Sequence, residues 1–108
     1  MKRTATAQWK GAGIDGTGSL TTLSGAFQEQ PYSFKTRFQN EDGKLGTNPE
    51  ELIAAAHAGC FNMALSFQLA GAGFPAKVLD TEAVVTMRNE DVHWHFDYIT
   101  LNLVGDVP

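Results

Sequence analysis

The feature that most constrains the fold is a strong helix-start signal at the head of a long apolar stretch. Asn48 is a favourable N-cap, and Pro49 at the first helical position loses no N–H that the helix needs. Glu51, three residues after Asn48, completes an Asn-led variant of the capping box. Glu50 and Glu51 also suit the positive end of the helix dipole. We therefore expect a helix that begins at Pro49.

This predicted helix is apolar on nearly every side. We expect it to end near Ala70, before the breakers Gly71, Gly73 and Pro75. Its first apolar stripe comprises Leu52, Ile53, Ala56, Cys60, Met63, Phe67 and Ala70. The opposite side is also apolar or small and comprises Ala54, Ala55, Ala58, Phe61 and Leu65. We expect the stripe with Cys60 to face inward, in a helix that is central to the fold or packs against a second copy.

Five segments with alternating side chains flank the helix and are typical of strands. They are Thr4–Lys10, Ser19–Phe27, Tyr32–Phe38, Lys77–Arg88 and Val92–Val104. The order β-β-β-α-β-β predicts an α+β fold, with an antiparallel sheet packed on the long central helix. The 108 residues match one domain, residues 1–108. One helix covers one face of a sheet poorly, so we expect either another chain or further sequence after Pro108 to cover the rest.

Charge and cysteine content exclude several classes of protein. Eight Lys and Arg residues against 12 Asp and Glu residues give a formal charge of −4, which is unfavourable for binding a nucleic acid backbone. No stretch approaches the roughly 20 apolar residues that cross a bilayer, and no signal-peptide core follows the N-terminus. A single cysteine excludes an intrachain disulfide and a multi-cysteine zinc site. We expect a cytoplasmic protein without a nucleic acid or membrane partner.

Cys60 is the first candidate for chemistry, and Arg37 and Glu50 are its candidate neighbours. Reactivity needs the thiolate, but Cys60 lies about three turns inside the helix, beyond the reach of the helix dipole. Arg37 on its predicted strand could supply the positive charge, and Lys35 on the same strand face could substitute for it. The alternatives are an inert buried thiol at Cys60, a solvated arginine, and a Glu50 that only serves the helix dipole.

The spacing of these residues limits how they can meet. Glu50 and Cys60 are ten residues apart, which is about 15 Å along an unbroken helix. One arginine cannot hydrogen-bond to both residues on the same helix. If Arg37, Glu50 and Cys60 form one site, either the helix is broken or two subunits contribute.

Histidines and glycines provide weaker candidates. His57 lies one turn before Cys60 and could act as its base, but a core-packing or interface role explains it better, because nothing in the sequence supplies an orienting third group. His93, His95 and Asp97 share a predicted strand face and could chelate a metal, or could simply be solvated. The glycines between 11 and 18 lack the lysine of a phosphate loop, so we interpret them as a hairpin turn.

Three segments resemble the OsmC/Ohr family, and more closely its osmotically inducible OsmC branch. The specific match is the run from Thr47 to Ser66, in which an Asn-Pro-Glu-Glu-Leu helix start leads to Cys60 and Phe61. The segment from Gln30 to Phe38 is similar to the family segment that carries an active-site arginine. The segment from Gln8 to Gly11 is similar to the first strand of the family.

The resemblance implies a thiol-dependent peroxidase that reduces organic hydroperoxides to alcohols in oxidative or osmotic stress defence, without a cofactor or metal. Cys60 would be the nucleophile and would become a sulfenic acid. Arg37 would stabilise its thiolate, and Glu50 would orient Arg37. The resemblance also implies an intertwined homodimer with its sites at the interface, and an external thiol or dithiol reductant.

The sequence departs from this family at one point. Members continue into a further helix and strand with a second, resolving cysteine, whereas Cys60 is the single cysteine here. The C-terminal part is then missing, or an external thiol resolves Cys60, or the domain is degenerate. The alternative function is a non-catalytic OsmC-like binding or structural dimer.

Overall fold

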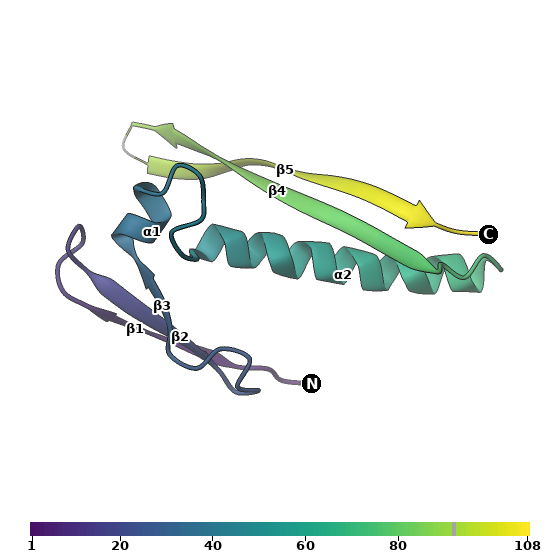
Figure 1. The fold of residues 1–108 in the computed structure, drawn as a ribbon, viewed down its shortest axis with the longest axis horizontal. Helices are drawn as coiled ribbons and strands as arrows, with labels where there is room; N and C mark the ends of the chain where they lie inside the picture. The colour runs from purple at the N-terminus through teal and green to yellow at the C-terminus, as the bar shows by residue number, and fades with distance from the viewer. Residues whose placement is uncertain (92) are drawn as a thin grey trace. The chain divides into compact units, whose positions relative to one another are not determined.

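The computed structural model describes residues 1–91 and 93–108 and has an α+β fold, as predicted. The described chain forms two compact units, Met1–Pro49 and Glu50–Pro108. Figure 1 shows the elements along the chain. They are β1 (Ala5–Lys10), β2 (Thr17–Thr22), β3 (Gln30–Ser33), α1 (Phe34–Phe38), α2 (Pro49–Gly71), β4 (Val78–Glu90) and β5 (His93–Asp106).

The first unit contains a three-stranded antiparallel sheet in the order β1-β2-β3. Gly11, with φ 97°, lies in the left-handed region in the turn between β1 and β2, which favours glycine there. Trp9 pairs with Gly18 on β2, and Gly18 pairs with Tyr32 on β3. Side chains of directly paired residues share a face, so the register aligns Trp9 and Tyr32 across a glycine.

The predicted third strand, Tyr32–Phe38, is wrong in its second half, which forms the short helix α1. Ser33 caps this helix: its Oγ accepts from the Thr36 N–H at 3.1 Å, and its own N–H donates to Thr36 Oγ1 at 2.9 Å. The reciprocal pair is a capping box, which favours a helix over a continued strand. The rings of Phe34 and Phe38, four residues apart on α1, lie 4.9 Å from each other.

Two asparagine side chains fasten the loop that follows α1. The Thr36 carbonyl oxygen accepts from Asn40 Nδ2 at 3.0 Å and from Asn48 Nδ2 at 3.4 Å. Asn40 Oδ1 also accepts from the Leu45 N–H at 2.9 Å. These bonds satisfy a carbonyl that a five-residue helix leaves without a helical partner, and they bring residue 48 back to α1.

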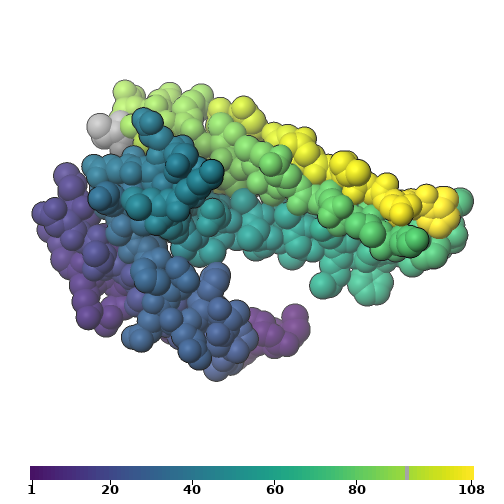
Figure 2. All heavy atoms as spheres, in the orientation of Figure 1, coloured from purple at the N-terminus to yellow at the C-terminus, as the bar shows by residue number. Residues whose placement is uncertain are grey.

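The second unit consists of α2 and the β4–β5 hairpin, which lie along each other in Figures 1 and 2. The helix runs without a break from Pro49 to Gly71, so the predicted start and the end near Ala70 are confirmed. Thr81 on β4 donates a hydrogen bond to Asn62 Oδ1 on α2. By length and composition α2 is also apolar enough to cross a membrane, contrary to our sequence expectation, although core helices of soluble proteins meet the same criterion.

The stripe with Cys60 does not face inward within the described chain, and its packing against a second copy stays a prediction. The half-buried stripe follows the side we described as opposite, and comprises Ala54, Ala58, Phe61, Leu65 and Leu69. The stripe with Cys60 is largely exposed, since Met63 is 66% and Phe67 74% exposed. Both sides of the helix are apolar, so hydrophobic periodicity could not distinguish them.

A register shift divides the β4–β5 ladder. Thr86 pairs with Tyr98 and Met87 pairs with Phe96, which leaves Asp97 as an extra residue on β5. A bulge of this kind reverses the alternation of faces. Tyr98 therefore lies on the face opposite Phe96, not with it as strict alternation predicts. Val92, the predicted first residue of this strand, lies outside the described residues.

Candidate functional site

Arg37 lies on α1 and lines a small aromatic pocket in the first unit. Its guanidinium carbon lies 4.7 Å from the centre of the Phe38 ring, which is a cation–π contact. The pocket has a volume of about 170 Å³. It is lined by Trp9, Gly13, Tyr32, Ser33, Phe34, Arg37, Phe38 and Pro49.

The wall of this pocket that faces the sheet depends on two glycines. The rings of Trp9 and Tyr32 lie 5.5 Å apart and are tilted by 49°. A Cβ on Gly18 would lie 2.5 Å from the Tyr32 ring, and one on Gly16 would lie 2.3 Å from the Trp9 ring. Only residues without a side chain leave room for both rings, so these glycines support the aromatic wall.

Because residues 34–38 form the helix α1, Lys35 can no longer substitute for Arg37. Glu50, at the start of α2, is next in sequence to a residue that lines the pocket. Lys35 and Arg37 would share a face on a strand, but residues two apart on a helix point in different directions, so Lys35 is no longer an equivalent donor. Pro49, the first residue of α2, lines the pocket with Arg37. Glu50 follows Pro49 and is half-buried at the start of α2.

Cys60 lies on α2 in the second unit and is exposed, which contradicts its predicted inward position. His57, one turn earlier, is exposed as well. A groove of about 440 Å³ runs beside this part of the helix and is bounded by Gly59, Asn62, Met63, Ser66 and residues 76–79. The described geometry therefore leaves the thiol accessible on a largely apolar stripe.

Glu50 and Cys60 belong to one continuous helix. The ten residues between them correspond to about 15 Å of axial rise. The sequence left two ways to form one site from Arg37, Glu50 and Cys60: a broken helix or a contribution from two subunits. The continuous helix excludes the first. It does not bring Glu50 and Cys60 within hydrogen-bond reach of one arginine on a single chain.

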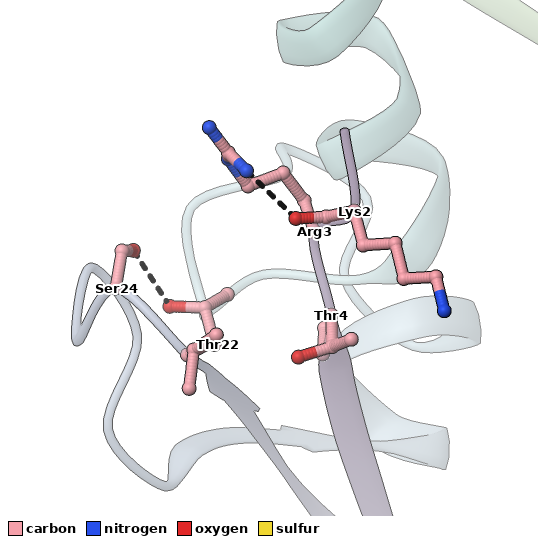
Figure 3. A pocket seen from close by; sticks show the side chains of 7 residues that line it. Lys2, Arg3, Thr4, Thr22 and Ser24 are labelled. Atoms are coloured by element: carbon pink, nitrogen blue, oxygen red, sulfur yellow. Dashed lines mark hydrogen bonds between the residues drawn. The ribbon is translucent and has the colours of Figure 1, made fainter.

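Neither the candidate metal ligands nor the basic N-terminus contributes to a site with Arg37, Glu50 or Cys60. Within residues 1–91 and 93–108, no group of three or more His, Cys, Asp and Glu side chains could hold a metal ion. A pocket of about 700 Å³ lies between the N-terminus and the end of β2. Figure 3 shows the side chains that line it. Arg3 there donates to the Lys2 carbonyl at 2.7 Å, and none of our candidate site residues lines this cavity.

Trp9 and Tyr32 are the site residues that sequence reasoning missed. They are 23 positions apart, and they meet because Gly18 pairs with both. The available signal was the position of Gly18 within a strand, where glycine often marks a close approach. Gly18 is instead interpreted as part of a turn, because it follows three other glycines between positions 11 and 18.

A family model and two sequence relatives agree on the family that this chain resembles. Residues 40–108 match the family model described as OsmC-like protein. The chain is 46% identical over 102 residues to a protein of Escherichia coli (strain K12) named peroxiredoxin OsmC. It is equally similar to the Shigella flexneri protein of the same name, and in both cases the match covers 94% of this chain and 69% of the relative.

A solved structure extends this similarity to the fold. The organic hydroperoxide resistance protein OhrB of Bacillus subtilis matches with a TM-score of 0.62 and 25% sequence identity. The match covers 96% of this chain and 71% of that protein.

Proposed function

The chain belongs to the OsmC-like protein family, and on that premise we propose that it is a thiol-dependent peroxidase acting on organic hydroperoxides. The observation that carries the proposal is an accessible Cys60 on the helix that matches the family model. The name of the relatives, peroxiredoxin OsmC, supports peroxide reduction as the reaction. The structural neighbour is named an organic hydroperoxide resistance protein, which supports organic hydroperoxides as the substrates.

The proposed reaction begins when the Cys60 thiolate attacks the terminal peroxide oxygen. An S–O bond forms and the O–O bond breaks, and the leaving alkoxide takes up a proton and departs as the alcohol. The sulfur has lost two electrons and becomes a sulfenic acid. An external thiol then displaces water to give a mixed disulfide, and a second thiol restores Cys60 and carries away the electrons as a disulfide.

We propose that Arg37 stabilises the thiolate and that Glu50 orients Arg37. Continuity of the helix between Glu50 and Cys60 supports a site to which two subunits contribute, because one chain cannot bring both residues to a single guanidinium. The exposed apolar stripe around Cys60 supports the same homodimer, since exposed apolar patches of this kind mark interaction surfaces. A cytoplasmic location and a role in oxidative or osmotic stress complete the proposal.

Replacement of Cys60 tests this function directly. We expect the wild-type chain to consume cumene hydroperoxide in the presence of a dithiol, and Cys60→Ser to lose this consumption. Ala55→Ser is the matched control, because it introduces the same hydroxyl at an exposed position on the same helix. With peroxide and no reductant, the mass of the wild-type chain should rise by two or three oxygens, since these 108 residues hold no second cysteine.

Two results would contradict the proposal. Equal peroxide consumption by Cys60→Ser and the wild-type chain would show that the thiol is not the nucleophile. A wild-type dimer that leaves cumene hydroperoxide intact would favour a binding or structural role instead.

A further inference from the structure

The Asn40 side chain holds the loop that follows α1 in a closed conformation. Its Oδ1 accepts from the Leu45 N–H at 2.9 Å, and its Nδ2 donates to the Gly46 carbonyl oxygen at 3.4 Å. The Asn40 backbone carbonyl also accepts from the Gly43 N–H at 3.0 Å, in a turn where Gly43 has a φ of 72°. One asparagine thus joins the two ends of the segment from residue 40 to residue 46.

The same side-chain amide attaches this loop to α1. Asn40 Nδ2 donates to the Thr36 carbonyl oxygen at 3.0 Å, and both residues are half-buried. Gly46 lies so close to Thr36 that a Cβ on Gly46 would be 2.9 Å from Thr36 Cγ2. Hydrogen bonds and close packing therefore hold the loop against the short helix within the first unit.

The bond from Asn40 is made to the peptide group that precedes Arg37. The Thr36 carbonyl and the Arg37 N–H belong to one planar group, so a bond to this oxygen fixes the plane that carries the Arg37 Cα. Helix α1 has five residues, whereas isolated helices shorter than about 12–15 residues are marginal in water. The position of Arg37 therefore depends on contacts that α1 makes outside itself, and Asn40 supplies one of them.

The guanidinium of Arg37 moves with this helix. The Arg37 side chain is exposed, and its guanidinium carbon lies 4.7 Å from the centre of the Phe38 ring on the same helix. A misplacement of about 1 Å can lower a catalysed rate on the order of 100-fold, because charge stabilisation depends on distance and orientation. A displacement of α1 would therefore weaken the stabilisation of an anion by Arg37.

We propose that Asn40 is a positioning residue for Arg37: its side-chain amide ties the loop of residues 40–46 to α1 and so holds the guanidinium where it stabilises the Cys60 thiolate. The inference rests on the proposed peroxidase function, because that function gives Arg37 its role. Asn40 acts through the backbone of α1 and does not contact the reacting atoms in this account.

The pH dependence of Cys60 alkylation tests this role without peroxide turnover. The probe is iodoacetamide, which reacts with the thiolate, and the alkylation midpoint is the pH at which the rate is half-maximal. We expect Asn40→Ala to raise this midpoint by roughly one unit, which corresponds to about tenfold less thiolate at a pH below the midpoint. Arg37→Ala should raise it at least as far. Gln39→Ala, at an exposed position next in sequence, should keep the wild-type midpoint.

Two further variants separate positioning from a general structural role. Asn40→Asp keeps an acceptor for the Leu45 N–H but has no donor for the Thr36 carbonyl, so we expect it to shift the midpoint as Asn40→Ala does. In the Arg37→Ala chain, Asn40→Ala should cause no further shift, because effects that pass through one residue are not additive. Circular dichroism identifies variants that fail to fold. With cumene hydroperoxide, kcat/KM should fall roughly tenfold in both Asn40 variants.

The results distinguish the positioning role from the peroxidase. Non-additive midpoint shifts in a chain that does not consume peroxide would sustain the positioning role and overturn the proposed function. An active peroxidase in which both Asn40 variants keep the wild-type midpoint would overturn the positioning role and leave the proposed function intact. The same holds if Asn40→Ala shifts the midpoint equally with and without Arg37, or if Asn40→Asp keeps the wild-type midpoint.

Discussion

Single residues decide whether the aromatic wall beside Arg37 can form. Gly18 is paired with Trp9 on one side and Tyr32 on the other, and the Tyr32 ring occupies the space that its side chain would need. The sequence makes Arg37 a candidate, because the segment from Gln30 to Phe38 resembles the family segment that carries an active-site arginine. It does not do so for Trp9 and Tyr32, because their proximity depends on strand register, which the alternation of polar and apolar residues leaves open in these strands.

The glycine requirement gives a prediction about stability. We expect Gly18→Ala to lower the free energy of unfolding by about 1–3 kcal/mol, the usual cost of overpacking. Its Cβ would lie 2.5 Å from the Tyr32 ring and 2.9 Å from the Gln8 carbonyl oxygen, and the backbone atom cannot easily move. Gly13→Ala is the control, because its Cβ would meet nothing within 4 Å. Urea unfolding of both variants checks this, and equal stability would contradict the packing argument.

At the scale of elements, the sequence predicts those helix ends that are determined by neighbouring residues in the chain. The start of α2 follows from Asn48, Pro49 and the two acids after them, and the helix begins where expected. The prediction for the second half of the third strand is wrong, because a capping box between Ser33 and Thr36 favours a helix over the strand that the alternating side chains predict. The half-buried face of α2 could not be predicted, since it depends on where β4 packs against a helix that is apolar on both sides.

The capping box should contribute measurably to α1. We expect Thr36→Val to lower the free energy of unfolding by about 1 kcal/mol, because it removes the hydroxyl bonded to the Ser33 N–H and keeps the shape of the side chain. Thr36→Ser keeps the hydroxyl and serves as the control. Denaturant unfolding of both compares them, and a Thr36→Val chain more stable than Thr36→Ser would contradict the role of the cap.

At the scale of the whole molecule, apolar surface is the dominant feature. Among residues 1–91 and 93–108, no hydrophobic side chain is fully buried. Phe67 on α2 is 74% exposed and Val104 on β5 is 73% exposed. A chain of about this size needs an apolar core to be stable, so we expect other protein surface to supply burial that these residues do not provide for one another. We expect a second copy to do so at the stripe around Cys60.

A charge on the stripe around Cys60 should weaken the proposed homodimer. Met63 is one turn after Cys60 and 66% exposed, so we expect Met63→Lys to raise the dissociation constant at least roughly tenfold, because a charge would be buried without a partner. Leu23→Lys places the same charge at a residue that is 80% exposed in the first unit. Sedimentation equilibrium measures both. A wild-type chain that is a stable monomer, or a Met63→Lys dimer of wild-type affinity, would contradict the assigned interface.

We propose that one chain supplies Arg37 and its partner supplies Cys60 to each site, and mixed dimers test this arrangement most directly. Cys60→Ser and Arg37→Ala chains should each be nearly inactive alone. Refolded together, they should recover about one quarter of wild-type activity, because about half of the dimers are mixed and each mixed dimer holds one intact shared site. Mixed dimers that form, as seen by mass spectrometry, and yet show no recovered peroxide reduction would contradict the shared site.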